Sequence, residues 1–111
     1  MLKRLFVYGT LAPGRPNAHV LSHVQGSWQR ASIHGHLVQA GWGAEHGYPG
    51  VIVSANGPIV EGFVLTSDDL ESEWVRLDEF EGVQYQRVVT QAQLADGQTV
   101  QVYVYQLAQS G

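Results

Sequence analysis

The acidic residues are the first candidates for chemistry, because seven of the ten lie between Asp68 and Glu81. Within this segment, four apolar side chains recur at the spacing of one helical face: Leu70, Trp74, Leu77 and Phe80. Asp78 and Glu79 then fall on the polar side of the helix, where we expect solvated side chains, whereas Glu81 projects back onto the apolar face. Burying a carboxylate on that face costs free energy, so we expect Glu81 to be protonated, to form an ion pair or to serve a function.

Two interpretations of Glu81 follow from its position. Burial would raise the pKa of its carboxyl towards neutrality, as a general acid and base requires. Close pairing with Arg87 would instead lower that pKa and form a buried ion pair that fixes the helix to the following strand. The sequence leaves both interpretations open.

The second candidate is the segment Tyr8-Gly9-Thr10-Leu11, which follows an apolar run. A strand that opens into a glycine turn exposes successive backbone N–H groups, and such a nest binds anions such as a carboxylate. Gly9 would let a ligand approach the backbone closely, and the hydroxyl of Thr10 could donate a further hydrogen bond. The alternative is a plain strand-to-loop turn, which a short glycine motif does not exclude.

Metal and thiol chemistry are disfavoured. The chain has no cysteine, which excludes a Cys nucleophile and thiolate metal sites. Two histidine pairs have spacings that could hold a metal, His19 with His23 and His34 with His36, but neither has a carboxylate nearby in a recognisable ligand pattern. No serine lies in a Gly-x-Ser-x-Gly turn. We therefore expect no metal.

Composition and charge narrow the function further. Six basic and ten acidic residues give a formal charge of −4 over 111 residues, so nucleic-acid binding is not expected. No apolar run approaches the roughly 18 residues that a membrane span needs, and the N-terminus lacks a secretory leader pattern, so we expect a cytoplasmic protein with no membrane association. The length fits a single domain over residues 1–111.

The elements that position these residues are mostly strands. Alternation and turn signals predict strands at residues 2–8, 28–38, 51–54, 59–65, 83–94 and 99–107, the last of them apolar on both faces and central. Within 28–38, the residues expected to face the core are Ala31, Ile33, Gly35 and Leu37. One helix begins after the N-cap Ser67 and ends at Gly82, and a shorter helix begins at Asn17, with Val20, Leu21 and Val24 on one face. About six strands with two main helices predict an α+β fold with a strongly curved sheet or small barrel.

Six motifs, in order along the chain, resemble the γ-glutamylcyclotransferase-like family, in its AIG2-like and γ-glutamylamine cyclotransferase branch. They are Leu5-Phe6-Val7-Tyr8-Gly9-Thr10-Leu11, Gly14-x-Pro16-Asn17, Tyr48-Pro49-Gly50, Val60-Glu61-Gly62-Phe63-Val64, Leu77-Asp78-Glu79-Phe80-Glu81-Gly82-x-x-Tyr85-x-Arg87 and Val102-Tyr103-Val104-Tyr105.

The resemblance implies a compact mixed barrel with a pocket at its mouth, lined by Tyr8, Gly9, Thr10 and Leu11, with Tyr85 as a further substrate-binding residue. The family's catalytic carboxylate matches Glu81. The implied reaction is intramolecular aminolysis of a small γ-glutamyl amine or peptide, which releases 5-oxoproline with Glu81 as general acid and base. It would need no cofactor.

Two alternatives stay open. The chain could instead be a non-catalytic binding module that holds a carboxylate ligand in the amide nest of residues 8–11. The segment 40–50 contains four glycines, so we expect no regular structure there. Its aromatic residues Trp42 and Tyr48 could shape the leaving-group side of the pocket, or only cap the barrel.

Overall fold

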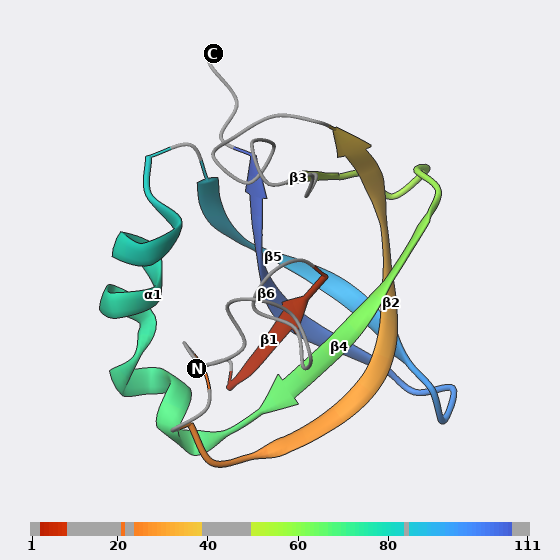
Figure 1. Ribbon diagram of the computed structural model, residues 1–111. Coiled ribbons are helices and arrows are strands. Elements are labelled where there is room, and N and C mark those ends of the chain that lie inside the picture. Colours follow the sequence, from red (N-terminus) through yellow and green to blue (C-terminus); the bar gives the residue numbers. More distant parts are fainter. Residues whose placement is uncertain (1–2, 9–20, 22–23, 39–49, 84, 108–111) are drawn as a thin grey trace.

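Six strands form one sheet that curls around a common axis (Figure 1). In the computed structural model, residues 3–8, 21, 24–38, 50–83 and 85–107 are described. The strands are β1 (Arg4–Val7), β2 (Ser27–Val38), β3 (Gly50–Val53), β4 (Ile59–Thr66), β5 (Tyr85–Leu94) and β6 (Thr99–Leu107). A 3-10 helix, η3 (Asp68–Ser72), and the helix α1 (Trp74–Glu81) lie between β4 and β5.

Five of the strands close into a barrel. β1 pairs with β4, β4 with β2, β2 with β5 and β5 with β6, all antiparallel, and β6 returns to β1 in a parallel pairing. The sixth strand, β3, is an addition that pairs antiparallel with β2 and parallel with β6. The predicted α+β fold with a small mixed barrel is therefore confirmed. The helix predicted from Asn17 lies mostly outside the described residues, although Leu21 and Val24 are buried.

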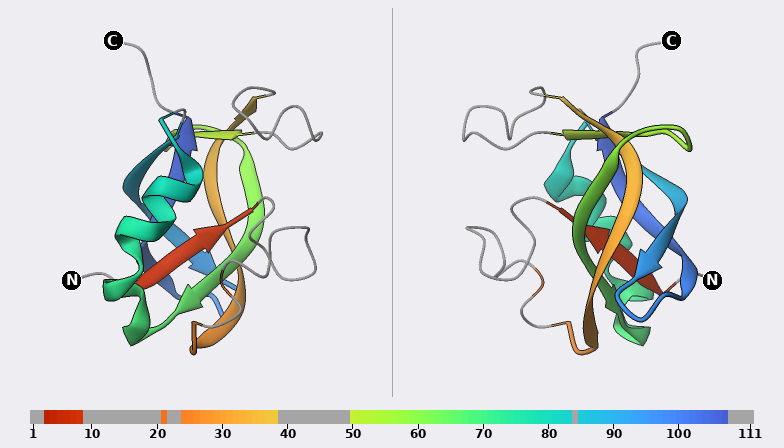
Figure 2. Two further views of the ribbon diagram at one scale, coloured as in Figure 1. Left: turned by 60° about the vertical axis from the view of Figure 1, so that its left-hand side comes forward. Right: turned by 90° about the vertical axis from the view of Figure 1, so that its right-hand side faces the viewer.

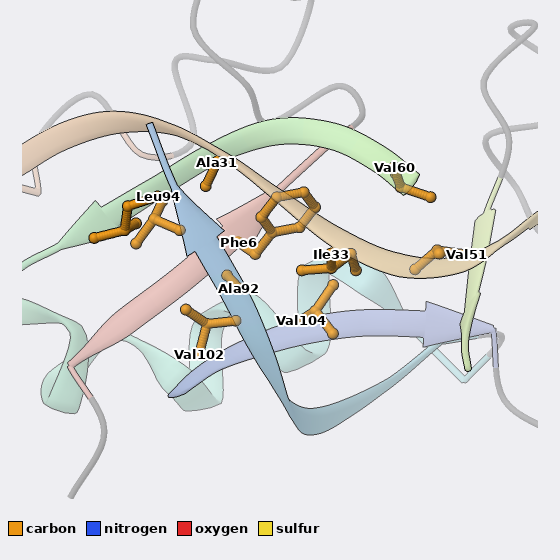
Figure 3. Packing of buried hydrophobic residues seen from close by; sticks show 10 residues of the cluster. Phe6, Ala31, Ile33, Val51, Val60, Ala92, Leu94, Val102 and Val104 are labelled. Carbon is orange, nitrogen blue, oxygen red and sulfur yellow. The ribbon is translucent and has the colours of Figure 1, made fainter. Parts of the chain in front are cut away.

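The apolar residues form two clusters on the two faces of the curved sheet. The first fills the barrel and includes Phe6, Ile33, Val51 and Val104 (Figure 3). The second lies between the barrel wall and helix α1, which covers one side of the barrel (Figures 1 and 2). Because side chains alternate along a strand, β6 contributes Val102 and Val104 to the first cluster and Tyr103 and Tyr105 to the second. β6 also pairs with β1, β3 and β5, which confirms the prediction that it is central.

One expected core residue is on the surface. Ala31, Ile33 and Gly35 are buried as predicted, but Leu37 is 51% exposed. The pairing of β2 with β4 ends at His34. Beyond that point β2 pairs only with β3, so the residues at its end extend past the closed part of the barrel.

The helical segment after β4 begins and ends where the sequence predicts. The hydroxyl oxygen of Ser67 accepts a hydrogen bond from the backbone N–H of Asp69 at 3.1 Å, as an N-cap does. Gly82 ends α1 with a φ of 81°, a backbone conformation that favours glycine. The segment is not one continuous helix, because its first turn is a 3-10 turn closed by a hydrogen bond from Glu73 N–H to the Leu70 carbonyl at 2.9 Å. Among the helices that the structure describes, none is long and apolar enough to cross a membrane.

Candidate active site

Tyr8 marks the end of the barrel where β1, β3 and β6 meet. Its hydroxyl donates a hydrogen bond to the backbone carbonyl of Tyr105 at 2.8 Å and accepts one from the backbone N–H of Val51 at 3.0 Å. Its ring stacks on Phe6, with 6.2 Å between the ring centroids. Burial raises the pKa of the Tyr8 hydroxyl far above its usual range, and the nearby carboxyl of Glu81 raises it further. The hydroxyl is therefore protonated, and its proton is already donated to the backbone.

Glu81 is the last residue of α1, and its side chain is half-buried. Removal from water disfavours the charged form of its carboxyl, which raises the pKa to about 7. The same carboxyl raises the pKa values of the Tyr8 and Tyr105 hydroxyls, so Glu81 lies close to both. A carboxyl with a pKa near neutrality can take up and return a proton at physiological pH.

In the structure, Arg87 forms its ion pair with Asp78. The Arg87 guanidinium forms a fork onto Asp78, with Nε 3.1 Å from Oδ1 and Nη2 3.3 Å from Oδ2. Asp78 is exposed, as predicted, but its carboxylate is not simply solvated, since it also accepts a hydrogen bond from the Tyr105 hydroxyl. The physical reason is the chain reversal after Gly82, which runs β5 back along the helix and brings Arg87 beside Asp78. Glu79 is exposed, as predicted.

Tyr85, the first residue of β5, is half-buried and packs against the cluster beneath α1. Its hydroxyl is close enough to contribute to the raised pKa of Tyr8. Tyr8, Glu81 and Tyr85 are thus neighbours, although 73 positions separate the first two in the sequence. The sequence reasoning missed Tyr105 as a part of this site, and its signal was the motif Val102-Tyr103-Val104-Tyr105.

Several predicted site residues lie outside the described part of the chain: Gly9, Thr10, Leu11, Trp42, Tyr48, His19 and His23. For the second histidine pair, Nδ1 of His34 lies 2.9 Å from the Gly57 carbonyl oxygen. The described residues contain no group of three or more His, Cys, Asp or Glu side chains that could hold a metal ion.

A separate cavity of about 570 Å³ lies over β2, β4 and β5. It is lined by Arg30, Ala31, Ser32, Glu61, Gly62, Phe63, Gln93, Leu94 and Ala95. None of these residues belongs to the predicted site. We therefore place the candidate active site at Glu81 and its aromatic neighbours and not in this cavity, because the raised pKa values belong to Glu81, Tyr8 and Tyr105.

Residues 5–111 match the family model described as gamma-glutamyl cyclotransferase, AIG2-like. The chain belongs to this family. Family membership supports γ-glutamyl cyclotransferase activity in general. No curated protein matches the sequence.

Solved structures of similar proteins agree with the assignment to the γ-glutamyl cyclotransferase, AIG2-like family. An AIG2-like protein from Mus musculus is 31% identical, with a TM-score of 0.72, over 99% of this chain and 80% of that one. YkqA from Bacillus subtilis is 26% identical, with a TM-score of 0.73, over 96% of this chain. The present chain spans only 36% of the length of YkqA. A glutathione-specific γ-glutamyl cyclotransferase from yeast, 14% identical with a TM-score of 0.59 over 93% of this chain and 67% of that one, shares the fold.

Proposed function

We propose that this chain is a γ-glutamyl cyclotransferase that acts on a small γ-glutamyl amine or peptide, with Glu81 as its general acid and base. The observation that carries the proposal is the half-buried carboxyl of Glu81, whose pKa burial raises to about 7, at the end of the barrel next to Tyr8 and Tyr85. Family membership supplies the class of reaction.

The reaction is an intramolecular aminolysis. The carboxylate of Glu81 takes a proton from the α-ammonium group of the substrate, and the free amine attacks the γ-carbonyl of the same glutamyl group. A C–N bond forms within the new five-membered ring while the original amide C–N bond breaks. Glu81 returns its proton to the leaving nitrogen, and the second proton lost by the ring nitrogen also goes to that nitrogen, which departs as an ammonium group. The products are 5-oxoproline and an amine or amino acid. The exchange consumes no water and no cofactor.

Positioning supplies a large share of the rate in such a reaction, because the attacking and attacked groups belong to one molecule. We assign the backbone amides of residues 9–11 to the α-carboxylate of the substrate. Tyr8 lies just before them, and two hydrogen bonds to the backbone hold its side chain in place. The Tyr8 hydroxyl is therefore held in place, and its proton is donated to the backbone carbonyl of Tyr105. We assign Tyr85 of β5, which acts electrostatically on the Tyr8 hydroxyl, to the same substrate-binding region.

The test is release of 5-oxoproline from a panel of γ-glutamyl amines and dipeptides. At least one compound should be turned over, and Glu81→Gln should lose roughly 10²- to 10⁴-fold in kcat because the proton transfer is lost. Glu79→Gln, the same change on the exposed side of the same helix, is the matched control and should keep its activity.

Two results would count against the proposal. Full activity in Glu81→Gln, with turnover in the parent protein, would overturn the role of this residue. No turnover across the panel, together with calorimetric binding of one of the compounds, would instead show a binding module that uses the same end of the barrel.

A further inference from the structure

Asp78 contacts two neighbouring strands at once. Arg87 and Tyr105 are direct partners across β5 and β6. Oδ1 of Asp78 accepts hydrogen bonds from Nε of Arg87 at 3.1 Å and from the Tyr105 hydroxyl at 2.6 Å, and Oδ2 accepts one from Nη2 of Arg87 at 3.3 Å. Three hydrogen bonds therefore join the middle of α1 to both strands beneath it.

The guanidinium of Arg87 is also held by aromatic rings. Its central carbon lies 4.6 Å from the ring centroid of Trp74 and 4.6 Å from that of Tyr103. The two rings pack edge to face, with 4.9 Å between their centroids. Ring faces attract a cation, and Arg presents a planar fork that matches a carboxylate. Trp74 belongs to α1 and Tyr103 to β6, so these contacts bind the helix to the same strands.

Tyr105 connects this network to the candidate site. Its side-chain hydroxyl donates to Asp78, and its backbone carbonyl accepts from the Tyr8 hydroxyl at 2.8 Å. Asp78 is also part of the last turn of α1, since its carbonyl accepts the N–H of Gly82 at 3.0 Å. Tyr105 of β6 therefore links Tyr8 to helix α1 and so fixes Tyr8 relative to Glu81 at the end of that helix.

The contacts of Asp78 and Arg87 also bear on the electrostatics of Glu81. Glu81 acts electrostatically on the hydroxyls of Tyr8 and Tyr105, Tyr85 acts on that of Tyr8, and Asp78 and Arg87 act on that of Tyr105, so these are the described titratable and charged groups of this region. Within this set, Arg87 supplies the positive charge. Asp78 pairs with that charge through the fork, and burial raises the pKa of Glu81.

We propose that Asp78 and Arg87 are positioning residues, which fix the end of α1 to β5 and β6, hold Glu81 at the barrel mouth and keep the guanidinium charge away from its carboxyl. The catalytic consequence rests on the proposed function, whereas the structural consequence does not. Sequence spacing alone placed Asp78 among solvated side chains, so the tertiary contacts carry this inference.

The main test is Asp78→Asn, with Glu79→Gln as the matched control on the exposed side of α1. Asp78→Asn removes one negative charge and leaves Arg87 unpaired. In the purified protein, NMR titration of the side-chain carboxyl carbon of Glu81 should show a lower pKa than in the parent, because an unpaired cation stabilises the carboxylate. Amide hydrogen exchange of Gly82 should become faster. Glu79→Gln should change neither quantity.

These two measurements need no turnover, so they separate this proposal from the proposed function. An unchanged Glu81 titration together with unchanged Gly82 exchange in Asp78→Asn would overturn the positioning role, whatever the enzyme assay shows. If Glu81→Gln abolishes turnover, Asp78→Asn should lower kcat by about tenfold or more while KM changes less, because misplacement of a catalytic group reduces the rate of the reaction step. The acidic limb of its pH profile should move to lower pH.

Two variants that change Arg87 separate the effect of its positive charge from the effect of its two hydrogen bonds to Asp78. Arg87→Lys keeps the positive charge beside Asp78 but loses the fork, so kcat should fall while the pKa of Glu81 stays near that of the parent. The double variant Asp78→Asn with Arg87→Met removes both charges, and its Glu81 pKa should return towards the parent value while kcat stays low. Full kcat in either variant would contradict the positioning role.

Discussion

The hydroxyl of Tyr8 donates a hydrogen bond to the backbone carbonyl of Tyr105, 2.8 Å away and 97 positions along the chain. The same oxygen accepts from the N–H of Val51, in the added strand β3. One side chain thus satisfies backbone groups of two other strands, at the end of the barrel where Glu81 lies.

Tyr8→Phe should destabilise the fold, because it leaves the carbonyl of Tyr105 and the N–H of Val51 without this partner. A buried polar group that loses its partner costs about 1–3 kcal/mol, and urea unfolding measures the change. Tyr103→Phe is the control, since within the described residues no hydrogen bond of its hydroxyl is found. Equal stabilities of the two variants would contradict the bridging role of Tyr8.

The pH dependence of turnover should report the carboxyl of Glu81. The proposed reaction needs its deprotonated form, and burial raises its pKa to about 7. The value of kcat/KM should therefore rise about tenfold per pH unit at acidic pH and level off above about pH 7. Measurement on the best compound of the panel from pH 5 to pH 9 checks this. An acidic limb centred near pH 4.5, the ordinary value for a glutamate, would show that the essential group is not a buried carboxyl.

Glu81→Gln should make the protein more stable at high pH. The folded state raises the pKa of this carboxyl from 4.5 to about 7, so folding favours its protonated form. The stability from that preference is fully present below pH 4.5 and is lost as the pH rises through 7. Above pH 7 the buried charge costs up to about 3 kcal/mol, at 1.36 kcal/mol per pKa unit.

Urea unfolding at pH 8 and pH 4 tests this linkage. The gain in Glu81→Gln relative to the parent should appear at pH 8 and be almost absent at pH 4. Glu79→Gln should show no such pH-dependent gain, because its side chain is exposed. The same gain at both pH values would mean that the amide, and not the loss of a buried charge, stabilises the variant.

Local patterns in the sequence predict the elements well, because each pattern acts within a single turn or strand. Ser67 and Gly82 bound the helical segment through their own backbone preferences. The helical repeat of apolar residues places Leu70, Trp74 and Leu77 in the core. The same repeat set Glu81 apart from the exposed Glu79, and alternation along β6 predicts a strand that is buried on both faces.

The arrangement of charges at the site could not be predicted in this way. Sequence spacing allowed Arg87 to pair with Glu81, but the reversal at Gly82 and the register of β5 against β6 place its guanidinium beside Asp78 and Tyr105. Similarly, Leu37 fits the inward alternation of its strand, yet it is exposed because the pairings of β2 with β4 and β5 end before it and only β3 pairs with β2 there.

The sequence by itself determined the strands, the helical face and the inward position of one glutamate. Only the tertiary structure decided that Arg87 pairs with Asp78, and which tyrosine hydroxyls lie near that glutamate. The physical reason is the sequence separation of the interacting residues. Capping, helical repeats and strand alternation depend on residues a few positions apart. Ion-pair choice and burial depend instead on side chains that the closed barrel brings together from distant strands.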